Sequence, residues 1–397
     1  MASQKFMLDE MPWNENFRVP DLENVLTPAL VVYPEAVASN IACTLKLLGG
    51  DPNRWRAHIK TAKLDYTLRL LIDRGVRNFK CATTLELLHA CQNGAEDVLL
   101  AYPVVGANAR RVIEIKQQFP RVRISVLVES PEQLPQWRGN DIGIFLDINP
   151  GMNRTGLELN ATEMNAPEKL IEVIRAIRDS SLEFRGLHFY DGQYGSVDEP
   201  ERTLATHAGY DQLLKAVEDL RRKGIDAAEV ITAGTPTFPC SRSYEKFHNA
   251  SFVHRVSPGT VVYNDATSLA QLPAAFGYAP AALVLTRVVS RPHPGIVTCD
   301  AGHKAVSADA GVPTCIVVGH PELSPLTPSE EHLPLAVNNG EGDGVLTPHI
   351  GDALYLLPRH ICPTVNNFDA ALIVRHGKIE AVERVSARGH EGPQLTS

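Results

Sequence analysis

Residues 78–103, NFKCATTLELLHACQNGAEDVLLAYP, decide the fold class of this chain. A short apolar run lies at each end, as in buried strands, and the segment between them has the 3.6-residue period of an amphipathic helix. Gly94 follows the last periodic residue, where a helix often ends in the left-handed conformation that glycine adopts without strain. This strand–helix–strand order predicts two parallel strands joined by a crossover helix.

The same alternation extends from about residue 54 to residue 265. Strand patterns occur at WRAHIKT (55–61), NFKCAT (78–83), DVLLAYP (97–103), RISVLVE (123–129), IGIFLDI (142–148), FRGLHFY (184–190), AEVITAG (228–234) and FVHRVSPG (252–259). Helical patterns occur between most of them, at residues 65–75, 85–94, 108–119, 167–180 and 209–224. Parallel strands in this number predict a (β/α)₈ TIM-like barrel. The alternative, an open doubly wound sheet, is less favoured because no GxGxxG follows the first strand.

After about residue 266 the pattern changes to short β-type runs rich in Pro and Gly, at residues 282–290, 295–300, 313–319, 353–358 and 369–385. We therefore expect an N-terminal extension over residues 1–26, the barrel over 27–265 and an all-β domain over 266–397. The run TPALVVYP (27–34) has strand character and could join the β domain instead of the barrel.

Composition is ordinary for a soluble globular protein, with 44% apolar and 21% charged residues. A net charge of −8 without a basic stripe argues against nucleic-acid binding. No apolar run approaches the ~20 residues of a membrane span, and the first residues lack the pattern of a secretory signal. The seven cysteines are scattered without a CxxC pair, which predicts reduced thiols and a cytoplasmic location.

Active residues of a barrel lie at the carboxyl ends of its strands. Polar or small residues at these predicted positions are Lys60, Thr83, Arg154, Tyr190, Gly234, Thr235 and Tyr263. A desolvated lysine at the barrel mouth is a usable amine nucleophile, and Lys60 could be one, but its position alone is more typical of a solvated lysine. We place Lys63 in solvent at the start of the following helix. The turn TAGTPTF (232–238) is a candidate phosphate cradle, and the guanidinium of Arg154 could hold an anionic oxygen.

His360 and Cys362 lie two residues apart in LPRHICPTVN (357–366). In an extended segment this spacing places both side chains on one side. Imidazole and thiolate together suit Zn²⁺, and two protein ligands leave positions for water or substrate.

Taken together, these stretches resemble the fold-type III pyridoxal-phosphate enzymes, and within them the D-threonine aldolase and D-serine dehydratase family. The matching stretches include TPALVVYPEAVASNI, RAHIKTAK, FKCATTLELLHA, NPGMNRTGLE, GLHFYDGQYG, ITAGTPTF, SPGTVVYND and PRHICPTVNNFDAALIV, and the resemblance spans about residues 27 to 388. It implies an alanine-racemase-like barrel that binds pyridoxal phosphate, a β domain that carries a metal, and a homodimer.

The resemblance also implies roles for single residues. Lys60 would be the Schiff-base lysine, with His58 as a neighbouring catalytic residue. The cofactor's phosphate would lie on Gly234 and Thr235, and its remaining contacts would come from Arg154, Tyr190 and Tyr263. His360 and Cys362 would hold a divalent metal, for which the cysteine favours zinc over manganese or magnesium.

The implied substrate is a D-3-hydroxy amino acid, and the implied activity is that of a lyase. We favour retro-aldol cleavage to glycine and an aldehyde. The alternative is β-elimination, as in zinc-dependent D-serine or D-3-hydroxyaspartate dehydratases, which the Cys362 ligand resembles more. Gln193 stands where a related aldolase motif tends to carry histidine, so the general base of the aldolase reaction is not assigned. An amino-acid racemase leaves the His360–Cys362 pair unexplained, and a non-enzymatic cofactor-binding barrel would lack the β domain.

Overall fold

The computed structural model describes residues 17–159, 166–338 and 348–393. Of the expected N-terminal extension, residues 1–16 lie outside the described residues. The chain divides into two compact units. Within the described residues, the β unit comprises residues 17–44, 61–67 and 260–388, and the barrel unit comprises residues 45–60, 68–259 and 389–393.

The barrel unit contains a sheet of parallel strands arranged in their sequence order, joined mostly through helices. The strands are β2 (Arg56–His58), β3 (Asn78–Cys81), β4 (Asp97–Leu100), β5 (Arg123–Val128), β6 (Gly143–Asn149), β8 (Glu183–Phe189), β9 (Glu229–Thr232) and β10 (Val253–Val256), and the short β7 (Leu157–Glu158) pairs with β6. A parallel bridge from Trp55 to Val256 links the two outer strands, so the sheet nearly closes. The predicted barrel and all eight of its predicted strands are confirmed.

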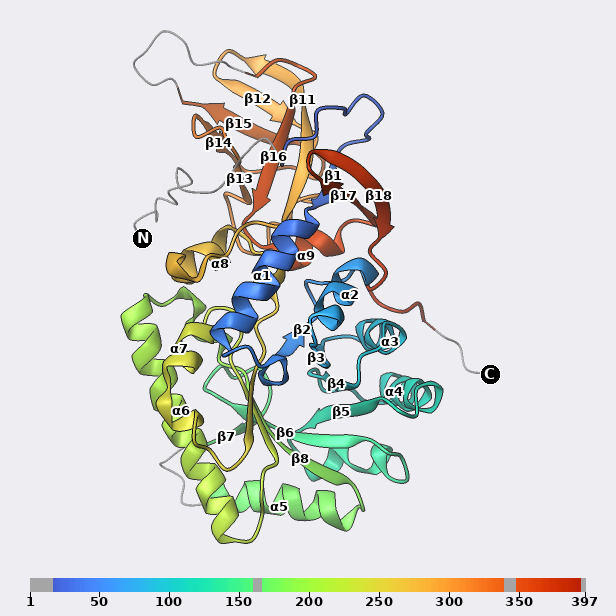
Figure 1. Ribbon diagram of the computed structural model, residues 1–397, viewed down its shortest axis with the longest axis vertical. Coiled ribbons are helices and arrows are strands. Elements are labelled where there is room, and N and C mark those ends of the chain that lie inside the picture. The colour runs from blue at the N-terminus through green and yellow to red at the C-terminus, as the bar shows by residue number, and fades with distance from the viewer. Residues whose placement is uncertain (1–16, 160–165, 339–347, 394–397) are drawn as a thin grey trace. The chain divides into compact units, whose positions relative to one another are not determined.

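Helices alternate with these strands, and α3, α4 and α5 lie along the outside of the sheet in Figure 1. Their bounds are α2 (Asp65–Asp73), α3 (Thr84–Gln92), α4 (Ala107–Gln118), α5 (Ala166–Asp179), α6 (Glu199–Arg222) and α7 (Phe238–Ser243). Helix α6 begins well before residue 209, where the apolar period starts, because Asp198 is its N-cap residue and a proline lies in its first turn.

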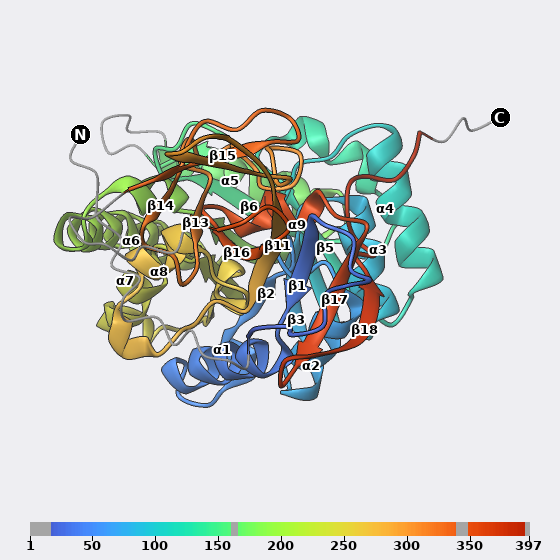
Figure 2. The ribbon, with the colours of Figure 1, turned by 90° about the horizontal axis from the view of Figure 1, so that it is seen from above.

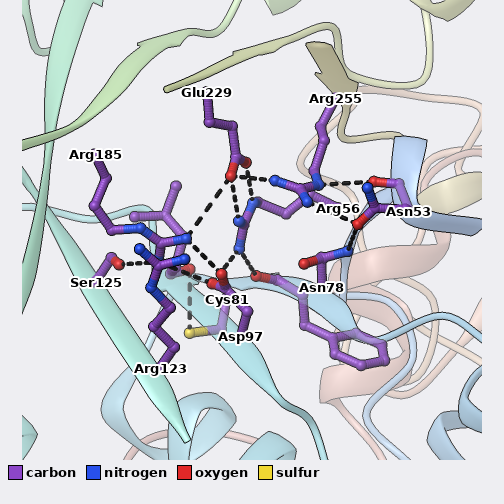
Figure 3. Close-up of polar contacts among 12 residues, drawn as sticks. Asn53, Arg56, Asn78, Cys81, Asp97, Arg123, Ser125, Arg185, Glu229 and Arg255 are labelled. Atoms are coloured by element: carbon purple, nitrogen blue, oxygen red, sulfur yellow. Dashed lines mark hydrogen bonds and ion pairs between the residues drawn. The ribbon is translucent and has the colours of Figure 1, made fainter. Parts of the chain in front are cut away.

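The barrel interior is layered along its strands. At the amino ends of the strands, Glu229 accepts hydrogen bonds from Arg56 and Arg255, while Asp97 accepts them from Arg56 and Arg185. Figure 3 shows these side chains converging on the two carboxylates. Above them lies an apolar layer formed by Leu99, Leu127, Phe145 and Ile231. Pairing satisfies the buried charges, and the polar groups that could do chemistry lie at the opposite ends of the strands.

The β unit is built on a mostly antiparallel sheet with the order β14-β15-β12-β11-β1-β17-β18, to which β16 and β13 attach through β11. The strands are β1 (Ala29–Val32), β11 (Ala282–His293), β12 (Ile296–Cys299), β13 (Cys315–Val317), β14 (Leu323–Pro325), β15 (Leu333–Val337), β16 (Ala353–Pro358), β17 (Ala370–Arg375) and β18 (Lys378–Arg384). Figure 2 shows β1 beside β11 and β17, and β1 pairs with both. The run at 27–34 therefore pairs with strands of the β unit.

Three helices accompany this sheet, namely α1 (Pro34–Leu47), α8 (Ala266–Gln271) and α9 (Ile361–Asn366). Strands β14 and β15 are not among the predicted strands, because each is short and each contains a proline. Within the described ranges, no helix combines the length and the apolar character that a membrane crossing requires.

Candidate active site

Lys60 lies just beyond the carboxyl end of β2, half-buried, and its backbone is fixed on two sides. The amide of Lys60 donates to Nδ1 of His58 over 3.3 Å, and the preceding amide, of Ile59, donates to the carbonyl of Lys80 over 2.8 Å. A Cβ on Gly259 would lie 2.3 Å from the carbonyl oxygen of His58. Only glycine therefore lets the segment after β10 approach β2 here.

A buried chain of polar groups lies at the same ends of β3, β6 and β8. Lys80 Nζ lies 3.3 Å from His188 Nε2, and His188 Nδ1 lies 2.7 Å from Asp147 Oδ1. The other carboxylate oxygen of Asp147 accepts from the hydroxyl of Thr155 over 2.7 Å. Because the carboxylate only accepts, His188 donates through Nδ1 and presents the lone pair of Nε2 to the amine.

Burial and charge set the protonation of this chain. Burial, the charge of Lys60 and that of Arg154 lower the pKa of Lys80 to about 7, although Asp147 opposes this shift. Burial and the Lys80 amine also lower the pKa of His188, which favours a neutral imidazole. Burial raises the pKa of Asp147, but the hydrogen bonds from His188 and Thr155 and the charge of Lys80 outweigh it and lower that pKa overall. The chain thus holds an anionic carboxylate, a neutral imidazole and an amine that gives up its proton near neutral pH.

Tyr190 follows β8, and two cations flank its ring. The guanidinium carbon of Arg154 lies 4.8 Å from the ring centroid and Lys80 Nζ lies 5.2 Å from it. Such contacts attract the cations to the electron-rich ring face and hold the ring in place. The structure thus brings Tyr190 together with Arg154, as the sequence predicts, and with Lys80, which was not among the predicted site residues.

The turn after β9 is fixed by a buried carboxylate. Thr237 donates its hydroxyl to Asp191 and accepts from the amide of Gly234 over 3.2 Å. The second oxygen of Asp191 accepts from the Tyr210 hydroxyl over 2.5 Å. A Cβ on Gly234 would come within 2.9 Å of the Tyr190 ring, so glycine lets the turn and the ring pack together.

Two buried hydroxyls, which follow the carboxyl ends of β9 and β10, are candidates for binding a phosphate group. The side-chain oxygens of Thr235 and Ser257 are buried and have no hydrogen-bond partner within the described part of the chain. The amide of Ser257 donates to the carbonyls of Thr232 and Ala233, which holds the two strand ends together. Buried hydroxyls in proteins are nearly always hydrogen-bonded. Phosphate oxygens would accept hydrogen bonds from these two hydroxyls, so Thr235 and Ser257 fit the phosphate of pyridoxal phosphate.

His360 and Cys362 lie in the β unit. Burial opposes protonation of His360, but the side chains of Cys362 and Asp309 outweigh it and raise the pKa of His360 to about 9. Asp309 lies 2.6 Å from His360 Nδ1, and the thiol of Cys362 lies 2.8 Å from the Thr61 hydroxyl. With Nδ1 held by a carboxylate, Nε2 is left as the metal-ligating atom. An imidazole and a thiol that meet in this way fit a divalent metal.

The expected extended conformation of this segment is wrong in part. His360 is extended, with φ −136° and ψ 108°, but it is the N-cap residue of α9, and Cys362 lies within that helix. The two side chains still meet, because the helical turn starts between them. Within the described residues, no group of three or more His, Cys, Asp and Glu side chains has metal-binding geometry.

Two other predictions concern residues of the β unit. Tyr263 is fully buried, and its hydroxyl lies 2.6 Å from that of Thr67. Its role towards the cofactor stays a prediction. Lys63 was expected in solvent, which is wrong. It is 5% exposed, its Nζ donates to the carbonyl of Ala387 over 3.2 Å, and α2 begins only at Asp65. Its long apolar stem makes such burial feasible.

Comparison with known proteins gives the family. Residues 32–267 match the alanine racemase N-terminal domain. The chain belongs to that family. Residues 281–374 match a second family, described as "Putative serine dehydratase domain". The alanine racemase-type barrel and the serine dehydratase-type domain therefore follow one another along this chain.

Similar proteins of known activity match almost the whole chain. It is 27% identical to a 3-hydroxy-D-aspartate aldolase from Paracoccus denitrificans (strain Pd 1222), over 93% of this chain and 94% of that protein. It is also 27% identical to a D-threonine aldolase from Arthrobacter sp, over the same shares. The crystal structure of a D-threonine aldolase from Filomicrobium marinum is 26% identical, with a TM-score of 0.81 over 92% of this chain and 96% of that one. Proteins similar to this chain thus include aldolases named for D-threonine and for 3-hydroxy-D-aspartate.

Several residues of the site were not singled out from the sequence, namely Lys80, Asp147, His188, Asp191 and Ser257. All lie within or directly after predicted strands. The sequence feature that could have identified them is a polar residue inside an apolar strand. Lys80 and His188 are such residues. A polar side chain at an inward position near the carboxyl end of a barrel strand is a site candidate.

Proposed function

We propose that this protein is a pyridoxal-phosphate-dependent, metal-assisted lyase that cleaves a D-3-hydroxy amino acid to glycine and an aldehyde. The observation that carries this proposal is a pair of features in one chain: the lysine at the barrel mouth, and the convergent His360 and Cys362 side chains. A racemase of this fold would leave the second feature without a role. The 27% identity to two D-hydroxy amino acid aldolases, over nearly the full chain, agrees with it.

Residues of the barrel unit fit the cofactor. Lys60 would carry it, Thr235 and Ser257 would bind its phosphate, and Tyr190 with Arg154 would lie along it. When bound, pyridoxal phosphate supplies an electron sink for the substrate's α-carbon. Its other predicted contacts come from Gly234 and Tyr263, and His58 would be a neighbouring catalytic residue.

The chain's own groups then have separate tasks. The amine of Lys60 accepts or donates the proton at the substrate's α-carbon, and the guanidinium of Arg154 holds an anionic oxygen. Tyr190 and the fixed turn at 232–238 orient the bound groups and exclude water. Asp191 acts indirectly, because it holds Thr237 and, through it, the amide of Gly234.

His360 and Cys362 would hold the divalent metal, with Asp309 orienting the imidazole. A metal held there is a Lewis acid that acidifies a coordinated hydroxyl, or makes it a better leaving group. We propose zinc, because the thiolate ligand favours it over manganese or magnesium. Residues 27–265 and 266–397 would be the cofactor-binding and metal-binding domains.

A second candidate is β-elimination by a D-serine or D-3-hydroxyaspartate dehydratase, which gives a 2-oxo acid and ammonia. The match of residues 281–374 to the serine dehydratase domain and the Cys362 thiol favour it. Both reactions would use the same residues. They differ in whether the Cα–Cβ bond or the Cα–H bond is aligned for cleavage.

The assembly and location are also proposals. The family resemblance implies a homodimer, which light scattering on the purified protein would test. All seven cysteines are free thiols, which fits a reducing, cytoplasmic environment.

The test is a product assay on purified protein loaded with pyridoxal phosphate and zinc. D-threonine and D-serine are supplied separately, L-threonine is the stereochemical control, and EDTA removes the metal. Glycine and acetaldehyde from D-threonine alone, lost with EDTA, support the aldolase. Pyruvate and ammonia from D-serine, or 2-oxobutyrate from D-threonine, support the dehydratase instead. Formation of L-allo-threonine from D-threonine, or of L-serine from D-serine, without cleavage would contradict both.

A further inference from the structure

The loop that follows β6, residues 150–156, carries Arg154. Strand β7 pairs with the last two residues of β6, so the loop begins and ends at neighbouring points of the sheet. Within the described ranges, the Arg154 guanidinium contacts the Tyr190 ring at 4.8 Å and forms no ion pair. We propose that Asn149, the last residue of β6, is a positioning residue for Arg154, because its side-chain amide fixes the loop and so holds the guanidinium ready for an anionic oxygen.

The side chain of Asn149 organises the first half of the loop. Its oxygen accepts from the amide of Gly151 over 3.0 Å and from the amide of Asn153 over 3.0 Å. Its nitrogen donates to the side-chain oxygen of Asn153 over 3.0 Å. Asn153 has a φ of 55°, in the left-handed region that asparagine adopts more readily than most residues. One side chain, which is 9% exposed, therefore sets the backbone directly before Arg154.

Other residues hold the two ends of the loop. Nε2 of Gln193, in the turn after β8, donates to the carbonyl of Pro150 over 2.9 Å. On the far side of Arg154, the hydroxyl of Thr155 donates to Asp147 over 2.7 Å. These anchors leave the middle of the loop to Asn149, so loss of the Asn149 amide should displace Arg154 without detaching the loop from the barrel.

The charge of Arg154 acts on the groups of the candidate site. Burial is the largest cause of the lowered pKa values of Lys80 and His188, and the charge of Arg154 adds to both shifts. A cation whose position is fixed in advance binds an anion better, because less conformational freedom is lost on binding. The anionic oxygen belongs either to the cofactor or to the carboxylate of an amino acid, and a guanidinium suits both. The inference rests on the proposed role of Arg154.

The experiment is a double-mutant cycle between Asn149 and Arg154. It measures the Kd of the stripped enzyme for pyridoxal phosphate and the Kd of the loaded enzyme for glycine, both followed by visible absorbance. We expect Asn149→Ala to raise one of the two Kd values about tenfold or more. In the Arg154→Ala background, the same substitution should change that Kd by less than about twofold. A higher Kd for pyridoxal phosphate assigns the oxygen to the cofactor, and a higher Kd for glycine assigns it to the amino acid's carboxylate.

Two further variants separate positioning from general stability. Asn149→Asp keeps an oxygen that accepts from both loop amides, so it should retain most of the affinity that Asn149→Ala loses. Asn140→Ala is the control and should change neither Kd. Asn140 precedes the opposite end of β6, where its amide donates to the carbonyl of Arg138 over 3.1 Å. If Asn149→Ala does not fold, as judged by circular dichroism, Asn149→Ser takes its place in the cycle.

The outcomes that overturn the inference are distinct from those that overturn the proposed function. If Arg154→Ala raises a Kd and Asn149→Ala changes neither, only the role of Asn149 is refuted. The same holds if Asn149→Ala weakens binding equally with and without Arg154, since its effect would then not pass through the guanidinium. If Arg154→Ala changes neither Kd, the proposed role of Arg154 is refuted and this inference with it.

Discussion

Lys60, Lys63 and Lys80 carry the same side chain in three different settings. Lys60 is half-buried at a strand end, Lys63 donates to a backbone carbonyl, and Lys80 is buried against His188. The sequence motif favours Lys60 over Lys63 as the cofactor lysine, and this choice stays a prediction. It could not place Lys63, because the carbonyl that receives its amine belongs to Ala387, more than three hundred positions later.

Lys60→Ala removes the amine to which the cofactor would be attached. We expect loss of the visible absorbance of bound pyridoxal phosphate and a loss of activity of at least about 10³-fold. Absorption spectroscopy of the purified variant with added cofactor checks this, with Lys116→Ala as the matched control. An unchanged absorbance band would exclude Lys60 as the site of attachment.

Cys362→Ala removes one of two proposed metal ligands. We expect the metal content per chain and the activity to fall together, and the affinity to drop by about tenfold or more, since loss of even an outer-shell partner has that effect. Elemental analysis after dialysis measures the content. Cys315→Ala, at a buried thiol of β13, is the control. A fully metallated and active Cys362 variant would refute the metal role.

Among the elements, the turn that follows β9 shows that a local sequence pattern does not identify the distant side chains that support a turn. The sequence TAGTPTF predicts a turn with a hydroxyl, but the group that holds it, Asp191, follows a different strand. Patterns along the chain predict strands and helices. A hydrogen bond such as that of Thr237 to Asp191 joins side chains that only the folded structure brings together. Helix α9 is a similar case, because its six residues are too few to show a helical period.

Thr235→Val tests this turn as a phosphate site. The substitution keeps the shape of the side chain and removes a hydroxyl that has no partner among the described residues. Losing a hydrogen bond to a charged group costs about 1.5–3 kcal/mol, so the Kd for pyridoxal phosphate should rise about tenfold or more. Equilibrium binding to the stripped enzyme measures it, with Thr206→Val on α6 as the control. Equal affinities in wild type and Thr235→Val would remove this residue from the phosphate site.

On the scale of the whole molecule, alternation of strand and helix was sufficient to predict the barrel, because each parallel strand must be followed by a crossover. The β unit was predicted less completely, since β14 and β15 are short and interrupted by proline. The ion pairs at the amino ends of the barrel strands were not predicted. Arg56, Asp97 and Glu229 come from three strands, and nothing in their local sequence links them.

These ion pairs should make the barrel sensitive to acid. Burial raises the pKa of Asp97, but Arg56 and Arg185 outweigh it and lower that pKa well below its ordinary value. The group therefore stabilises the fold above the carboxyl's unfolded pKa of about 3.9, and this contribution is lost as the pH falls towards the folded value. Urea midpoints measured from about pH 7 to pH 3 should fall more steeply for wild type than for Asp97→Asn.

The Asp97→Asn variant should also be less stable at neutral pH. It leaves Arg56 and Arg185 buried without that partner, which typically costs about 3–5 kcal/mol. Asp141→Asn, at a mostly exposed carboxylate, should change stability by less than about 1 kcal/mol. An Asp97 variant as stable as wild type at every pH would contradict the structural role of these ion pairs.

The most direct test of the account is to identify the residue that carries the cofactor. Wild-type protein is loaded with pyridoxal phosphate, reduced with borohydride, digested and mapped by mass spectrometry. The account predicts that the cofactor mass is found on the peptide that contains Lys60. Its recovery on Lys63 or Lys80, or on no lysine at all, would contradict the central claim that this barrel presents Lys60 to the cofactor.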